Sequence, residues 1–204
     1  MATDLVTITA AASAAVTTAE AKTHMRVDYA TDDTYIDELV DIATTQVEGI
    51  TGFKLMAQTS ELRADSFRDV GIVHPSMPDI LRLRVAPIST LTSVKYDDAD
   101  DTEQTMSSSD YWEDLKSVPN RIRVKTQWPE TEEKIAAVRI RMATGFASAA
   151  AIPEHFKLAI KLLVGHWYEN REETTELVLS EIPVGVNNIL MARAEYHFVT
   201  MMAA

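Results

Sequence analysis

The chain of 204 residues contains no cysteine and only six glycines, and both shortages exclude familiar kinds of chemistry. Without cysteine it can form no disulfide, no thiolate zinc site and no cysteine nucleophile. The glycines do not cluster, so the sequence has neither a phosphate-binding loop nor a dinucleotide-binding Gly-x-Gly-x-x-Gly motif. The motifs Gly-x-Ser-x-Gly and His-Glu-x-x-His are also missing. We therefore expect no cofactor, no metal and no catalytic residues.

Positive charge is scarce as well, because 31 acidic residues face 19 basic ones and leave a formal net charge of −12. Such a chain is a poor candidate for non-specific DNA binding, which needs a basic surface. Its hydrophobic content of 46% and charged content of 25% are typical of a globular protein with its own core. The start, Met1 to Asp4, has no basic signal-peptide pattern, and the apolar run 158–167 is too short to cross a membrane. We expect a protein assembled in the cytoplasm.

Hydrophobic periodicity predicts one domain, residues 1–204, made of three consecutive blocks. The first block, 17–52, is helical. A capping box at 17–20 opens a helix that runs to about Arg26. A second helix begins near Asp32, with Thr31 as its predicted N-cap, and stops at Gly52.

The second block, 53–145, changes to the period of two that is typical of strands. Apolar and charged residues alternate along 81–85, 121–124 and 138–142, and the acidic run 97–101 predicts a hairpin turn. The third block, 152–204, is helical again, with Pro153 in the first turn and a last helix over about 187–199. The predicted fold is α+β: a small bundle of about four helices with a β-hairpin or sheet insertion between helices two and three. The predicted core includes Ile36, Leu39, Val40, Val47, Phe156, Ile160, Leu163 and Trp167.

Two other groups of residues give only weak indications of chemistry. The five histidines do not pair at metal-ligand spacing. The acidic run 97–101 lacks the glycine and the glutamate that an EF-hand calcium loop requires, so a solvated hairpin turn is favoured. An enzyme that uses carboxylates such as Asp98 and Asp100 remains the least favoured alternative.

Arginines alternate with apolar residues along three predicted strands. These arginines are Arg82, Arg84, Arg121, Arg123, Arg139 and Arg141. One interpretation is a solvated face with cross-strand ion pairs to groups such as Glu61, Asp65 or Glu103. The other is a basic sheet face that contacts the acidic helical block of a neighbouring copy, because residues 1–60 contain nine acidic and three basic side chains.

The last predicted helix and the residues after it are unusually apolar. Ile189, Leu190, Met191, Phe198 and Met201 follow one another with few charges between them. Such a segment can close the core of its own chain, or it can dock in a groove on a partner. Methionine side chains adapt to irregular surfaces, which suits the second role.

An ordered set of motifs resembles the head–tail connector proteins, or head-completion adaptors, of tailed phages. The set begins with Ala19-Glu20-Ala21-Lys22-Thr23-His24-Met25-Arg26-Val27-Asp28, then Asp32-Asp33 and the helix end Val47-Glu48-Gly49-Ile50-Thr51-Gly52. It continues with Ser93-Val94-Lys95-Tyr96-Asp97, Ile152-Pro153-Glu154, His166-Trp167-Tyr168-Glu169-Asn170-Arg171-Glu172 and Ile182-Pro183-Val184-Gly185-Val186. Together these pieces cover most of the chain in the order of the family.

The resemblance implies a structural virion protein that forms a ring of about twelve identical copies below the portal. The ring would extend the DNA channel, let DNA pass without sequence-specific binding, and dock the next connector, stopper or tail protein. It implies a place in the virion neck, after assembly in the host cytoplasm, and no membrane. The residues assigned to portal binding are Ile189, Leu190, Met191, Arg193, Tyr196, Phe198 and Met201. A stopper or tail terminator of the same virion is the alternative, although such proteins tend to be mostly β.

Overall fold

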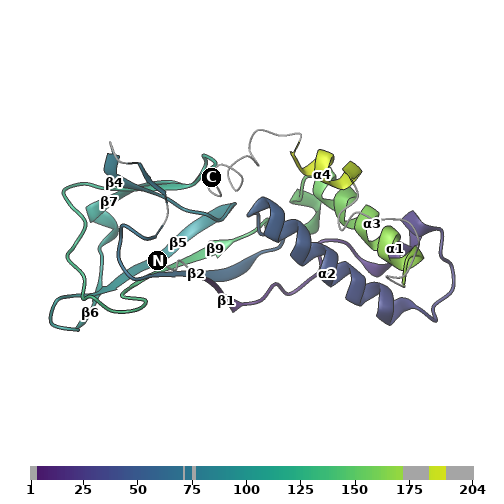
Figure 1. Cartoon of the computed structure of the whole chain (residues 1–204), viewed down its shortest axis with the longest axis horizontal. Coiled ribbons are helices and arrows are strands. Elements are labelled where there is room, and N and C mark those ends of the chain that lie inside the picture. Colours follow the sequence, from purple (N-terminus) through teal and green to yellow (C-terminus); the bar gives the residue numbers. More distant parts are fainter. Residues whose placement is uncertain (1–3, 71, 75–76, 172–183, 192–204) are drawn as a thin grey trace. The chain divides into compact units, whose positions relative to one another are not determined.

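A computed structural model describes residues 4–70, 72–74, 77–171 and 184–191 and shows a mixed α+β chain, as predicted (Figure 1). Its residues group into two compact units. The sheet unit is Met1–Ala12 with Ala57–Gly145, and the helical unit is Ser13–Met56 with Phe146–Ala204. The chain thus passes between the units three times. That 1–204 behaves as a single domain stays a prediction.

The helical unit begins with α1 (Thr18–Met25) and α2 (Asp33–Thr51). The predicted capping box of α1 is confirmed: the Thr17 hydroxyl accepts from Glu20 N at 3.2 Å, and the Glu20 carboxylate accepts from Thr17 N at 2.8 Å. The N-cap prediction for α2 is wrong by one residue, because Asp32 occupies that position. Gly52 ends α2 with φ 71°, a conformation that glycine adopts without strain.

The long apolar helix of this unit is α3 (Glu154–Glu169), which packs against α1, α2 and α4 (Val184–Met191). Pro153 is its N-cap rather than its first residue. Seven of the eight predicted core residues are buried, namely Ile36, Leu39, Val40, Val47, Phe156, Ile160 and Leu163. The eighth, Trp167, is only half-buried, because it lies near the end of α3.

The sheet unit contains a five-stranded antiparallel sheet with the order β1-β2-β9-β5-β6. Its strands are β1 (Asp4–Thr9), β2 (Gln58–Ala64), β5 (Ile88–Asp97), β6 (Glu103–Thr105) and β9 (Val138–Thr144). The sequence pattern does not indicate β1. Its residues precede α1, so not every strand described lies between the second and third helices. The hairpin between β5 and β6 confirms the predicted turn at 97–101.

A four-stranded antiparallel sheet of order β3-β4-β8-β7 completes the unit. Its strands are β3 (Ile72–His74), β4 (Met77–Arg82), β7 (Tyr111–Asp114) and β8 (Arg121–Val124), and the short helices η1 (Ser108–Asp110) and η2 (Ala149–Ala151) lie elsewhere in the chain. Alternate side chains of both sheets, such as Ile140 of β9 and Ile122 of β8, share one buried cluster. The charged side chains between them therefore lie on the outer faces of the sheets.

Candidate functional site

The six predicted arginines do not share one face, because the structure divides them between the two sheets. Arg82 on β4 and Arg121 and Arg123 on β8 belong to the four-stranded sheet, and Arg84 follows β4. Arg139 and Arg141 lie on β9 of the five-stranded sheet. Each group has its own partners.

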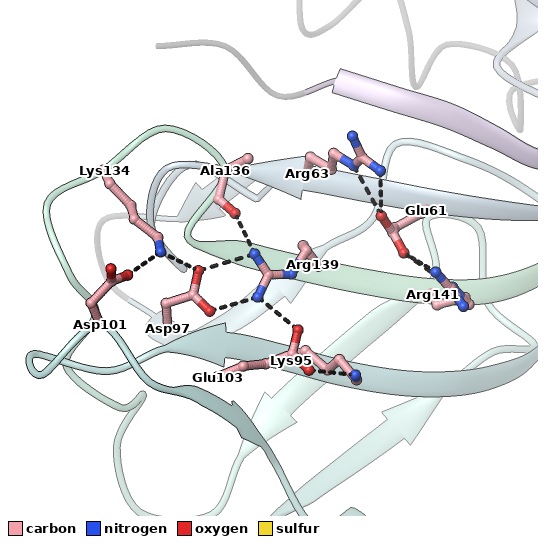
Figure 2. Close-up of polar contacts among 10 residues, drawn as sticks. All are labelled: Glu61, Arg63, Lys95, Asp97, Asp101, Glu103, Lys134, Ala136, Arg139 and Arg141. Carbon is pink, nitrogen blue, oxygen red and sulfur yellow. Dashed lines mark hydrogen bonds and ion pairs between the residues drawn. The ribbon is translucent and has the colours of Figure 1, made fainter.

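On the five-stranded sheet the arginines are paired with carboxylates of neighbouring strands (Figure 2). Glu61 of β2 is almost fully buried and accepts from Arg141 Nη2 at 2.7 Å and from Arg63 Nε at 2.9 Å. Burial raises the pKa of Glu61, but the hydrogen bonds from Arg141 and Arg63 outweigh it and leave that pKa below its usual value. This side chain is therefore ionised and neutralised within its own sheet.

Asp97, at the end of β5, pairs with two basic side chains. Its carboxylate accepts from Arg139 at 2.6 and 3.0 Å and pairs with Lys134 Nζ at 2.9 Å. The hydrogen bond from Arg139, helped by Lys134, lowers the pKa of Asp97 to about 2. Arg139 also reaches Glu103 at 3.0 Å, and Glu103 pairs with Lys95 at 2.6 Å. Cross-strand ion pairs, the first interpretation of the arginine pattern, thus explain the arginines of this sheet. The Asp65 carboxylate, which was expected to pair with an arginine, accepts from Ala136 N instead.

The outer face of the four-stranded sheet is less balanced. Arg121 pairs with Asp114 at 2.5 Å, and Arg123 pairs with Asp79 at 2.6 Å. Hydrogen bonds from Arg121, and then from Ser117, lower the pKa of Asp114. Arg82 lies directly opposite Arg121, an arrangement of like charges that disfavours the pair. No acidic partner for Arg82 exists among the described residues, so this face keeps an excess of positive charge.

Trp112 of β7 adds an exposed aromatic ring to the same face. It is 56% exposed and lies opposite Arg123 in the register. The Arg123 guanidinium lies 6.0 Å from the ring centroid and Lys125 Nζ lies 5.3 Å from it, which are cation–π distances. The sequence does not single out Trp112, because β7 is a four-residue edge strand with no clear alternation.

A second cluster ties the end of α3 to the start of α2. Tyr168 donates to Asp32 at 2.7 Å and contacts the Tyr29 hydroxyl at 2.7 Å. Arg171 donates to the same Asp32 oxygen at 2.7 Å and lies 4.8 Å from the Tyr35 ring and 4.7 Å from the Tyr168 ring. The hydrogen bond from Tyr168, followed by that from Arg171, lowers the pKa of Asp32. The cluster therefore holds the C-terminal end of α3 against the start of α2.

The predicted portal-binding residues are only partly within the described chain. Leu190 is fully buried in the helical unit, and Ile189 and Met191 are half-buried on α4. Arg193, Tyr196, Phe198 and Met201 lie outside the described residues. For Leu190, closing the core of its own chain is what the structure shows.

Within the described residues, no group of three or more histidine, aspartate or glutamate side chains is placed to hold a metal ion. The Asp98 carboxylate instead accepts from the backbone N–H of Asp100 and Thr102 and from Gln104 Nε2, which shapes the hairpin turn. None of the described helices combines the length and apolarity needed to cross a membrane.

Comparison with known proteins gives two findings. Residues 121–193 match the family model of phage gp6-like head–tail connector proteins. The fold is similar to that of a chain in the neck of an empty gene transfer agent (GTA) particle computed with C6 symmetry, with TM-score 0.73 and 23% identity over 92% of this chain and 93% of that chain. A chain in the virion of the native GTA particle is similar with TM-score 0.73 and 23% identity over 91% and 92%.

A third similar chain comes from the neck of the native GTA particle computed with C12 symmetry, with TM-score 0.70 and 23% identity over 92% of both chains. A search of curated protein sequences gave no significant match. Residues 121–193 therefore resemble the gp6-like head–tail connectors in sequence, and the chain resembles these neck and virion chains in fold. The predicted resemblance is confirmed.

Proposed function

We propose that this chain, which carries the sequence pattern of the gp6-like head–tail connectors over residues 121–193, forms a homo-oligomeric ring of about twelve copies in a virion neck. The observation that carries the proposal is the combination of this family match with a fold similar to chains from neck structures of C6 and C12 symmetry. The ring extends the DNA channel below a portal and docks the next connector, stopper or tail protein. Assembly takes place in the host cytoplasm.

Acidic side chains line the lumen in this proposal. The net charge of −12 supports it, since an acidic wall repels the DNA backbone and lets DNA slide without being held. The inter-subunit contacts involve the predicted arginines. Arg82 and Arg84 fit this role best, because neither has an acidic partner among the described residues. Each of the other four, Arg121, Arg123, Arg139 and Arg141, already pairs with a carboxylate of its own sheet.

The C-terminal segment binds the portal. Its proposed contacts are Ile189, Met191, Arg193, Tyr196, Phe198 and Met201, while the buried Leu190 holds α4 on α3. The cluster around Asp32 and Arg171 supports this role, because it holds the C-terminal end of α3, the helix against which α4 packs.

Truncation tests the portal contact. Removal of residues 188–204 should abolish binding to purified portal complexes, measured by co-sedimentation. That variant also loses Leu190 from the core, so a second variant lacking only 192–204 keeps α4 intact and should give the same loss. Portal binding by the shorter truncation would show that the tail assignment is wrong.

A further inference from the structure

Trp112 stands at a position where a single aromatic side chain can contribute strongly to binding. It is exposed on β7, and a surface depression beside it is lined by Ile80, Trp112, Glu113, Asp114, Arg121 and Arg123. The Arg123 guanidinium lies 6.0 Å from the centroid of the Trp112 ring, and Lys125 Nζ lies 5.3 Å from it. Tryptophan and arginine are the residues most enriched at binding hot spots. We define the basic patch as Arg82, Arg121, Trp112, Arg123 and Lys125. Asp114 and Asp79 already pair with Arg121 and Arg123, so the excess positive charge of the patch comes from Arg82 and Lys125. Such a surface fits an acidic partner with an apolar centre.

The outer side of α2 has that chemistry. Glu38, Asp41, Ile42 and Thr45 are exposed at helical spacing and form one stripe, which we call the acidic stripe. Ile42 is 55% exposed at its centre. Within the described chain, the carboxylates of Glu38 and Asp41 have no cationic partner.

The other acids of α2 are already engaged inside the helical unit. Asp33 pairs with Lys22 at 2.6 Å, and Asp37 accepts from the Thr18 hydroxyl. Glu48 accepts from Leu55 N and pairs with Lys54, both at 2.8 Å. The two carboxylates that flank Ile42 are therefore the ones left available for a partner.

We infer that the basic patch of one copy binds the acidic stripe of α2 in the neighbouring copy, with Trp112 packed against Ile42. The inference rests on the proposed ring and names its contact. The two surfaces differ and each copy carries both, so the contact is heterologous, the kind that closes into a ring when the rotation between copies is right. Charge complementarity and an apolar centre act at the same place, which favours one register.

A loop of the sheet unit is the main competitor for the basic patch. Ile135 is 89% exposed there, next to Glu132 and Glu133. However, Lys134 lies between those acids and Ile135 and pairs with Asp97, so a cation adjoins the apolar centre. The acidic stripe has no such cation among its four residues, and we therefore favour α2.

Cross-linking tests the contact directly, because the native chain has no cysteine that could interfere. Thr45→Cys lies on the acidic stripe and Ile80→Cys beside the basic patch, and both leave Trp112, Ile42 and the charges in place. The double variant, treated with a short bismaleimide, should give a ladder of covalent multimers on a denaturing gel. The matched control, Thr131→Cys with Ile80→Cys, places one cysteine on the competing loop and should run as a single uncross-linked chain on the same gel.

Rings seen by electron microscopy without a link between positions 45 and 80 would overturn the inferred contact and leave the proposed ring standing. A ladder from the Thr131 control, with none from the Thr45 variant, would show that the basic patch binds the loop around Ile135 and would overturn the inference as well. Absence of any ring, alone or on portals, would remove the proposed function together with the contact.

Substitutions give a second, quantitative test. Trp112→Ala should weaken self-association about thirty-fold, the effect of losing a hot-spot residue. Glu38→Arg with Asp41→Arg should weaken it about ten-fold or more, whereas Glu132→Arg with Glu133→Arg should leave it unchanged. All the residues changed are exposed except the half-buried Glu132, so thermal unfolding should match the native protein. If the two charge-reversal variants weaken self-association equally, the effect comes from the change in net charge, and the named contact is contradicted.

Discussion

At the scale of single residues, Asp97 is the most constrained charged group described. Only 3% of its surface is exposed, yet its carboxylate is ionised because Arg139 and Lys134 surround it. A carboxylate so removed from water is stable only while these partners stay in place. The group therefore stabilises the end of the β5–β6 hairpin.

Replacing Arg139 with methionine tests this role. Arg139→Met keeps the aliphatic stem but removes the two hydrogen bonds to Asp97, and it should lower the free energy of unfolding by about 1–3 kcal/mol. Lys95→Met removes the exposed pair with Glu103 and should cost less than about 1 kcal/mol. Urea titration measures both, and equal losses would show that the Asp97 pair has no special weight.

The pH dependence of stability follows from the same group. The pKa of Asp97 falls from 3.8 to about 2 in the folded protein. A carboxyl with a lowered folded-state pKa stabilises the fold above its unfolded pKa, and that contribution disappears as the pH falls from about 4 through about 2. Asp97→Asn should therefore flatten the decline of the free energy of unfolding between pH 4 and 2. If the free energy of unfolding of Asp97→Asn falls as steeply as that of the native protein, other carboxylates cause the decline.

At the scale of elements, the capping box of α1 is the local signal that sequence and structure share most closely. Thr17→Ala removes the acceptor for Glu20 N and should cost about 1 kcal/mol of unfolding free energy. Thr23→Ala is a suitable control on the same helix, because the Thr23 hydroxyl only donates to the carbonyl of Ala19 within that helix. A loss confined to Thr23→Ala in chemical denaturation would contradict the role of the box.

Elements with a strong period could be predicted from the sequence, and weakly patterned ones could not. The spacing of Ile36, Leu39, Val40 and Val47 predicts α2 because one face of the helix is buried. By contrast, β1 buries none of its residues fully, so selection on its apolar pattern is weak. On β7 only Tyr111 is buried, so its four residues show no clear alternation and the sequence pattern does not indicate Trp112.

The candidate surfaces could be predicted only in part, for a related reason. Alternation shows that Arg121 and Arg141 point away from a core, but it does not say to which sheet each strand belongs. Partners are distant in the chain: Glu61 and Arg141 are 80 positions apart, and Asp32 and Arg171 are 139 apart. Such pairs depend on strand order and helix packing, which local patterns do not encode.

At the scale of the whole molecule, the basic patch around Trp112 and the acidic stripe around Ile42 are two different surfaces of the same acidic chain. Exposed charge pairs are screened by salt. Self-association, measured by sedimentation velocity, should therefore weaken as the sodium chloride concentration rises from about 0.05 to about 0.5 M. Self-association that does not change with salt would show that charge complementarity does not hold the copies together.

Electron microscopy of the purified full-length chain, alone and mixed with portal complexes, tests the ring itself. We expect closed rings of one fixed copy number near twelve, seated on portals in the mixture. A monomer that shows no rings in either sample and no affinity for portals would contradict it.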